Sequence, residues 1–112
     1  MTTGVGAGPS GSTGVLRRRL VLHGVVQGVG FRRHAARLAR ELELSGWCRN
    51  EASSVVAEVE GPSEVVDEFA RRLTDEAPAL AVIRTVESTE LEPSGEPGFA
   101  VTATVPRIRR VR

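Results

Sequence analysis

The sequence predicts an α+β domain in which two helices cover one face of a mostly antiparallel β-sheet. Short β-branched or alternating apolar segments, which are typical of strands, recur along the chain, and two segments with apolar residues at helical spacing lie between them. Only a few residues separate one pair of strand segments, which indicates an antiparallel hairpin. The chain of 112 residues has the length of one domain and can bury a core without disulfides.

The first predicted strand covers residues 18–26, which are apolar and β-branched. A glycine-rich turn, Gln27 to Gly30, follows it. Next comes a helix of about three turns, in which arginines separate apolar residues that recur at helical spacing. These apolar residues are Phe31, Ala35, Leu38, Ala39 and Leu42. Residues 46–51 and 55–60 are then predicted to form the two strands of the hairpin.

The second helix is predicted to open at residues 61–64, because Pro62 suits a first helical turn, where its missing N–H is no loss. Its buried stripe is predicted to consist of Val65, Val66, Phe69 and Leu73. Two further strands are expected at about 81–89 and 98–105. The order β-α-β-β-α-β with a fifth strand is the ferredoxin-like arrangement, which hosts many functions and so does not name one.

Both ends of the chain are predicted to be tails around a domain at residues 15–105. Residues 1–14 are rich in Gly, Ser and Thr and read as a flexible tail. Residues 106–112 form a basic tail, for which a solvated terminus is preferred over contact with an anionic partner. The sequence shows neither a secretory signal nor an apolar run of the ~20 residues that span a membrane. A soluble cytoplasmic protein is therefore expected, with a monomer as the simplest oligomeric state.

Composition excludes several function classes. All fifteen basic residues are arginines, but the formal net charge is only +1, without the strong positive field of a general nucleic-acid binder. The single cysteine, Cys48, permits no internal disulfide and no zinc cluster. We therefore expect no metal, no other cofactor and no nucleic-acid partner.

The turn from Gln27 to Arg32 (QGVGFR) joins a strand to a helix N-terminus and is a candidate anion site. Glycines allow successive N–H groups to turn inward, and the helix dipole adds positive potential. Arg32 is unfavourable for the helix end itself but well placed to share an anion with the loop. The absence of lysine excludes a P-loop, and Arg33 stands where a dinucleotide fingerprint needs glycine. A tight turn with a surface arginine remains an equally good interpretation of this segment alone.

Asn50 is the second candidate, because asparagine is disfavoured in strands. Strand alternation places it on the face opposite Trp47, Arg49 and Glu51, where its amide could point into the same site as Arg32. An amide both donates and accepts and can therefore orient a water molecule. Taken alone, Asn50 is better explained as the start of the hairpin turn.

These segments together resemble the acylphosphatase family. The resemblance rests on VVQGVGFR at residues 25–32 and GWCRN at residues 46–50, and it extends over about residues 17–103. It implies that Arg32 and the loop amides hold a phosphate and that Asn50 positions the attacking water. The implied phosphate-binding residues are Gln27, Gly28, Val29, Gly30, Phe31 and Arg32. The implied reaction is metal-free hydrolysis of an acyl phosphate to a carboxylate and inorganic phosphate, which should also inhibit.

Some residues depart from the family pattern or have no role in it. Residues 50–54 read Asn-Glu-Ala-Ser-Ser where the family often has Asp-Gly, and the missing glycine could shift the aim of Asn50. His34 is expected to be an exposed helix residue, and His23 to be structural. Cys48 is expected to be a small buried side chain rather than a nucleophile, because no activating histidine is identifiable.

Two alternatives stay open. With residues 77–87, the VQGVGFR string also looks like the N-terminal acylphosphatase-like domain of hydrogenase-maturation carbamoyltransferases, which implies carbamoyl phosphate as substrate. A freestanding enzyme is favoured, because the cysteine pairs expected to follow that domain are missing. The other alternative is a non-catalytic module that binds phosphate or RNA. RNA is the weaker choice, because the aromatic residues needed for base stacking are scattered. The acyl group of the substrate is not predicted.

Overall fold

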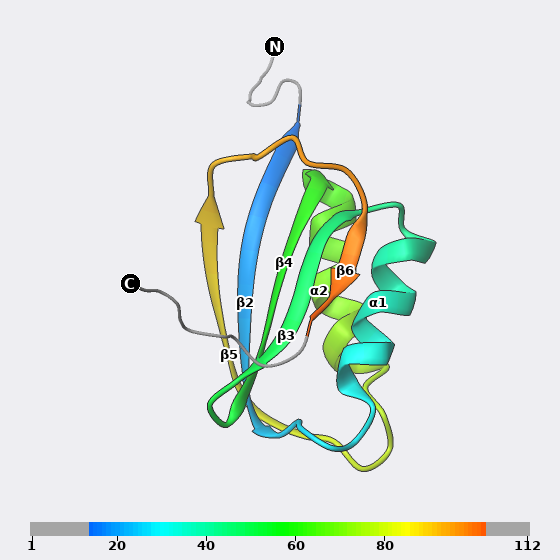
Figure 1. Ribbon diagram of the computed structural model, residues 1–112, viewed down its shortest axis with the longest axis vertical. Helices are drawn as coiled ribbons and strands as arrows, with labels where there is room; N and C mark the ends of the chain where they lie inside the picture. The colour runs from blue at the N-terminus through cyan, green and yellow to red at the C-terminus, as the bar shows by residue number, and fades with distance from the viewer. Residues whose placement is uncertain (1–13, 103–112) are drawn as a thin grey trace.

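The computed structural model describes residues 14–102 (Figure 1). The predicted basic tail and all but Gly14 of the predicted N-terminal tail lie outside the described residues, as do residues 103–105 of the last predicted strand. The elements follow in the order β2 (Val15–Val25), α1 (Phe31–Glu41), β3 (Ser45–Glu51), β4 (Ser54–Pro62), α2 (Ser63–Asp75), β5 (Val82–Leu91) and β6 (Phe99–Val101). The predicted ferredoxin-like α+β fold with a fifth strand is confirmed.

The five strands form one sheet in the order β5-β2-β4-β3-β6. Neighbouring strands are antiparallel except β3 and β6, which are parallel and pair Cys48 with Val101. The pairing of Leu22 with Val55 sets the end of β2 opposite the start of β4, so the β2–α1 loop and the β3–β4 hairpin lie at the same end of the sheet (Figure 1). This topology assembles the candidate site at that end.

The hydrophobic core lies between the sheet and the two helices, which cover the same face (Figure 1). Strand alternation selects the core residues, because Val55, Ala57 and Val59 of β4 are fully buried against the helices. In α2, the predicted stripe is confirmed. Its members Val66, Phe69 and Leu73 are buried, and Val65 packs partly buried against them.

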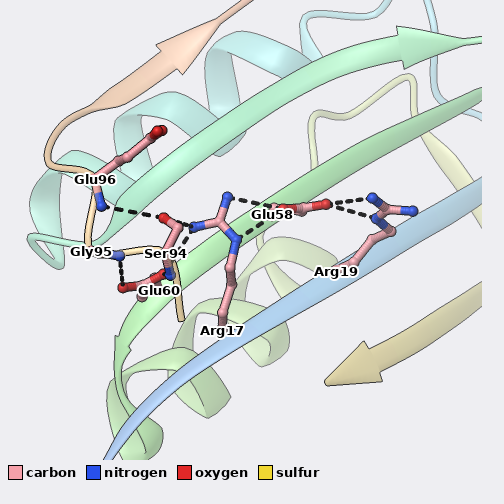
Figure 2. Close-up of polar contacts among 7 residues, drawn as sticks. All are labelled: Arg17, Arg19, Glu58, Glu60, Ser94, Gly95 and Glu96. Carbon is pink, nitrogen blue, oxygen red and sulfur yellow. Dashed lines mark hydrogen bonds and ion pairs between the residues drawn. The ribbon is translucent and has the colours of Figure 1, made fainter. Parts of the chain in front are cut away.

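The sheet face away from the helices carries a network of charged side chains (Figure 2). Arg17 pairs with Glu58 at 2.9 Å and with Glu60 at 3.0 Å, and Arg19 shares the Glu58 carboxylate. Glu60 also accepts hydrogen bonds from the main-chain N–H groups of Ser94 at 2.7 Å and Gly95 at 3.0 Å. One carboxylate therefore ties the β5–β6 loop to the sheet, and Arg17, Glu58 and Glu60 are less than 9% exposed.

Burial would by itself raise the pKa of the Glu60 carboxyl. The hydrogen bonds from Ser94, Gly95 and Arg17 outweigh burial and hold this pKa below its ordinary value. The burial of Glu60 beneath the β5–β6 loop was not predicted from the sequence.

Candidate active site

The β2–α1 loop has the backbone conformation that its glycines permit. Gly28 has φ 75° and Gly30 has φ 81°, both in the left-handed region that favours glycine. A Cβ at either position would meet nothing within 4 Å, so the backbone conformation rather than close packing calls for glycine. Gly30 is the N-cap of α1, and no side chain caps the helix. The first N–H groups of α1 lack partners within the helix and can therefore donate to an anion.

An open cleft of about 740 Å³ lies at this loop. Its lining includes Gly28, Gly30, Phe31 and Arg32, and Asn50 reaches it from β3. The structure thus brings together the two residues that the sequence proposed as catalytic. The cleft is large enough for a small-molecule ligand.

Two of the predicted phosphate-binding residues direct their side chains away from the cleft. The Gln27 side chain donates to the carbonyl oxygens of Ala52 at 2.7 Å and Ser54 at 2.9 Å. Val29 packs, partly buried, against the hydrophobic core. Only the main-chain groups of these two residues are therefore candidates for contact with a phosphate.

Arg32 is held by the end of β6. Its Nη1 donates to the carbonyl oxygen of Thr102 at 2.9 Å, and the Thr102 N–H donates to the carbonyl oxygen of Cys48 at 2.9 Å. Cys48 precedes Asn50 by two residues on β3, so one short segment connects the arginine to the strand that carries the asparagine. Thr102 was not predicted from the sequence, because it acts only through main-chain atoms and leaves no side-chain signal.

The alternation of β3 agrees with the prediction. Cys48 is fully buried in the core, whereas the Arg49 guanidinium lies over the Trp47 ring at 4.3 Å on the other face. Asn50 pairs with Val55, and the hairpin closes in register, with Glu51 opposite Ser54. Closure without glycine is possible because Ala52 takes a left-handed conformation with φ 54°.

Cys48 and His34 are both buried, although burial was predicted only for Cys48. Burial raises the pKa of the Cys48 thiol to about 12, although the positive charge of Arg32 acts in the other direction. This thiol is a core group rather than a nucleophile, as predicted. The expectation that His34 is exposed is wrong, since it is only 3% exposed.

Three groups contact the His34 ring, one of which is Arg37, whose Nη2 lies 3.4 Å from the ring Nδ1. Nε2 donates to the carbonyl oxygen of Leu73 at 3.2 Å, and the ring meets Phe31 edge to face at 5.6 Å. Burial lowers the pKa of His34. The burial of His34 could have been predicted from its spacing. His34 follows Phe31 by three residues and precedes Leu38 by four, which places it on the buried side of α1.

Three further arginines of α1, Arg33, Arg37 and Arg40, also line the cleft. From the sequence, these arginines were interpreted only as the polar positions between the apolar residues of the helix. Within residues 14–102, the His, Cys, Asp and Glu side chains form no group of three that could hold a metal ion. In the same range, neither helix is long and apolar enough to cross a membrane.

The fold and the cleft define a small ferredoxin-like domain in which a glycine loop, an arginine and a strand amide share one site. Residues 18–101 match the family model described as Acylphosphatase. The chain belongs to the acylphosphatase family, so the predicted family is confirmed.

Two groups of relatives match. The acylphosphatase of Acidiphilium cryptum is 41% identical over 91 residues, which are 80% of this chain and 99% of that protein. Carbamoyltransferase HypF of Rhizobium leguminosarum is 41% identical over 87 residues, which are 78% of this chain and 11% of that protein. The chain thus spans nearly the whole of one relative and about a tenth of the other.

Solved structures show the same two groups. Full-length HypF in its phosphate- and nucleotide-bound form superposes with a TM-score of 0.78 and 30% identity, covering 80% of this chain and 12% of that one. The acylphosphatase from Bacillus subtilis superposes with a TM-score of 0.74 and 27% identity, covering 78% of this chain and 98% of that one.

Proposed function

We propose that this protein hydrolyses acyl phosphates to a carboxylate and inorganic phosphate, without a metal, in the cleft between Arg32 and Asn50. One observation carries the proposal: in a member of the acylphosphatase family, Gly28, Gly30, Arg32 and Asn50 line a single cleft. The same proposal includes a domain at residues 15–105 between two tails, a cytoplasmic location and a monomeric state.

The phosphate is bound by main-chain N–H groups of the loop and by the Arg32 guanidinium. Thr102 occupies Nη1 of Arg32, which orients the planar fork and leaves its other N–H groups for phosphate oxygens. An acyl phosphate already has a good leaving group, so positioning and charge stabilisation are the main contributions required.

The Asn50 amide orients a water molecule for attack on phosphorus. The water oxygen bonds to phosphorus, the bond from phosphorus to the acyl oxygen breaks, and the carboxylate leaves. The described residues that line the cleft include no aspartate, glutamate or histidine to serve as a base. The water proton therefore passes to a phosphate oxygen.

Carbamoyl phosphate is a second candidate substrate. The similarity to carbamoyltransferase HypF, at 41% identity over 87 residues, supports it. Carbamoyl phosphate presents the same phosphate head group to the loop as benzoyl phosphate does, and its acyl part is smaller than a benzoyl group. Assaying carbamoyl phosphate beside benzoyl phosphate separates the two possibilities.

The test is hydrolysis of benzoyl phosphate in EDTA by the wild type, Arg32→Ala and Asn50→Ala. Arg84→Gln is a control, because it removes one positive charge on β5, outside the residues that line the cleft. We expect both site variants to stay folded by circular dichroism and to lose about 10²-fold or more in kcat. Inorganic phosphate should inhibit competitively. A folded wild type that binds phosphate but turns over neither substrate would reassign the chain to a non-catalytic phosphate-binding module.

A further inference from the structure

One buried titratable side chain behind the cleft has no part in the proposed reaction. His34 is not among the described residues that line the cleft, yet it contacts three that are. Its main-chain N–H donates to the carbonyl oxygen of Gly30 at 3.1 Å, and its ring meets Phe31 edge to face at 5.6 Å. Its Nδ1 lies 3.4 Å from Nη2 of Arg37. Any helical residue can make the first contact, whereas the other two depend on the imidazole.

The contacts of the ring determine which nitrogen carries the proton. Nε2 lies 3.2 Å from the carbonyl oxygen of Leu73, which can only accept, so Nε2 is the protonated nitrogen. In the neutral ring, Nδ1 therefore has a free lone pair. The Arg37 guanidinium can only donate, and its Nη2 donates to this lone pair. A doubly protonated ring would instead set an N–H against the guanidinium and bring two positive charges together.

The groups packed around the ring favour the neutral form. Burial lowers the pKa of His34, and the charge of Arg37 lowers it further. The main chain of Leu73 and Arg72 and the carboxylate of Glu76 act in the opposite direction. Glu76 is itself paired with Arg72, whose Nε donates to it at 2.9 Å. Burial prevails, and the pKa of His34 lies below its ordinary value of 6.5, so at neutral pH the ring offers a lone pair to Arg37.

Within residues 14–102, the Arg37 guanidinium depends on His34 for a partner. Arg37 is exposed, and no carboxylate of these residues forms an ion pair with it. It follows His34 by three residues and so lies beside it on the helix. A long exposed side chain loses conformational freedom when an anion fixes it. A partner that already holds the guanidinium reduces this loss and should strengthen anion binding in the cleft.

We propose that His34 is a positioning residue of the active site, whose neutral ring holds the Arg37 guanidinium at the wall of the cleft for contact with a bound anion. This inference rests on the proposed function and adds a residue that acts through Arg37 without touching the substrate. At 3.4 Å the hydrogen bond is long, so its loss should raise the Kd of inorganic phosphate by only about threefold.

A double-mutant cycle tests whether His34 acts through Arg37. Titration calorimetry at neutral pH gives the Kd of inorganic phosphate for the wild type, His34→Gln, Arg37→Gln and the double variant. His34→Gln keeps a donor for Leu73 and removes the imidazole Nδ1. We expect it to raise Kd about threefold in the wild-type background and to have no effect in the Arg37→Gln background. An equal increase in both backgrounds, or none in either, overturns the inference.

Arg40 provides the matched control for this cycle. It is another exposed arginine of α1 that lines the cleft, but its Nη2 donates to the carbonyl oxygen of Phe99 at 3.2 Å. The effect of His34→Gln should therefore remain about threefold in an Arg40→Gln background. If the effect disappeared there as well, His34 would act on the charge of the whole cleft rather than on Arg37, and the inference would be overturned.

An NMR titration of the His34 ring tests the contact itself. Arg37→Gln removes a repelling positive charge, so the pKa of His34 should rise toward 6.5, and the Nδ1 resonance should shift with the loss of its donor. A pKa and a resonance that both stay at their wild-type values overturn the inference.

Kinetics with benzoyl phosphate separate this inference from the proposed function. His34→Gln should raise KM by a larger factor than it lowers kcat, because Arg37 contributes to binding. A fall in kcat at constant KM overturns the inference. Phosphate binding that shows the expected coupling, without hydrolysis of benzoyl phosphate, overturns the proposed function alone. A wild type that hydrolyses benzoyl phosphate but shows no coupling between His34 and Arg37 overturns the inference alone.

Discussion

The side-chain amide of Gln27 joins the loop to the hairpin by donating to the carbonyl oxygen of Ala52 at 2.7 Å. A second hydrogen bond from the same nitrogen reaches the carbonyl oxygen of Ser54 at 2.9 Å. The loop leads into Arg32, and the hairpin follows Asn50 directly. Gln27 thus connects the two halves of the candidate active site, and its side chain supports the site rather than touching the cleft.

Replacing Gln27 by leucine should loosen this connection. The substitution keeps most of the side-chain volume but removes both hydrogen bonds, one of which is exposed, so we expect a loss of about 1 kcal/mol in the free energy of unfolding. A fall in kcat for benzoyl phosphate should accompany it, because Asn50 is no longer held in register with the loop. Urea unfolding and steady-state kinetics measure the two effects. Unchanged kcat would show that the hairpin positions Asn50 without Gln27.

Replacing Ala52 by glycine should increase the stability of the folded protein. Its φ of 54° lies in the left-handed region, which costs a residue with a Cβ about 1–2 kcal/mol. Glycine removes this strain and loses part of the gain to the entropy of the unfolded chain, so we expect Ala52→Gly to stabilise by about 0.5–1 kcal/mol. Ser53→Gly is the matched control, because Ser53 is outside that region and should gain nothing. A thermal melt that gives both variants the same Tm would contradict the strain argument.

The fold was predictable from the sequence because each element carried its own periodicity. In α2, Val66, Phe69 and Leu73 recur at helical spacing and all three are buried. The loop at Gly28 and Gly30 was predictable from its glycines, because two glycines just before a helix indicate a turn with left-handed backbone conformations.

The missed features depend on contacts between distant segments. Thr102 reaches Arg32 through the parallel pairing of β6 with β3, which no local pattern encodes. Glu60 reads as a solvated strand residue until Ser94 and Gly95 fold over it. His34 was misplaced because only apolar residues were counted in the buried stripe of α1.

Glu60 should make the β5–β6 loop sensitive to acid. The pKa of Glu60 is lower in the folded protein than its ordinary value of 4.5, so the unfolded chain takes up the proton first as pH falls. Its stabilising contribution is complete above pH 4.5 and is lost as pH drops toward the folded pKa. Glu60→Gln should therefore lower the free energy of unfolding by about 1–2 kcal/mol at pH 7 and by less at pH 3.

The comparison for Glu60 uses Glu96→Gln as its control. Glu96 is exposed in the same loop, and its main-chain N–H rather than its carboxylate makes the recorded hydrogen bond to Ser94. Denaturant unfolding at several pH values gives the stability of each variant. If Glu60→Gln lowered the free energy of unfolding equally at pH 7 and pH 3, then packing rather than the charge of Glu60 would hold the loop.

His34 should make the folded protein lose stability in mild acid. Burial lowers its pKa, and the charge of Arg37 adds to this, although the bond to Leu73 acts in the opposite direction. Protonation therefore favours the unfolded chain, so the contribution of His34 is complete above its ordinary pKa of 6.5 and is lost as pH falls toward the folded pKa. His34→Gln, whose amide can still donate to Leu73, should flatten the pH dependence of unfolding below pH 6.5. An NMR titration of the His34 ring in the folded protein measures its pKa directly, and a value at or above 6.5 would contradict this account.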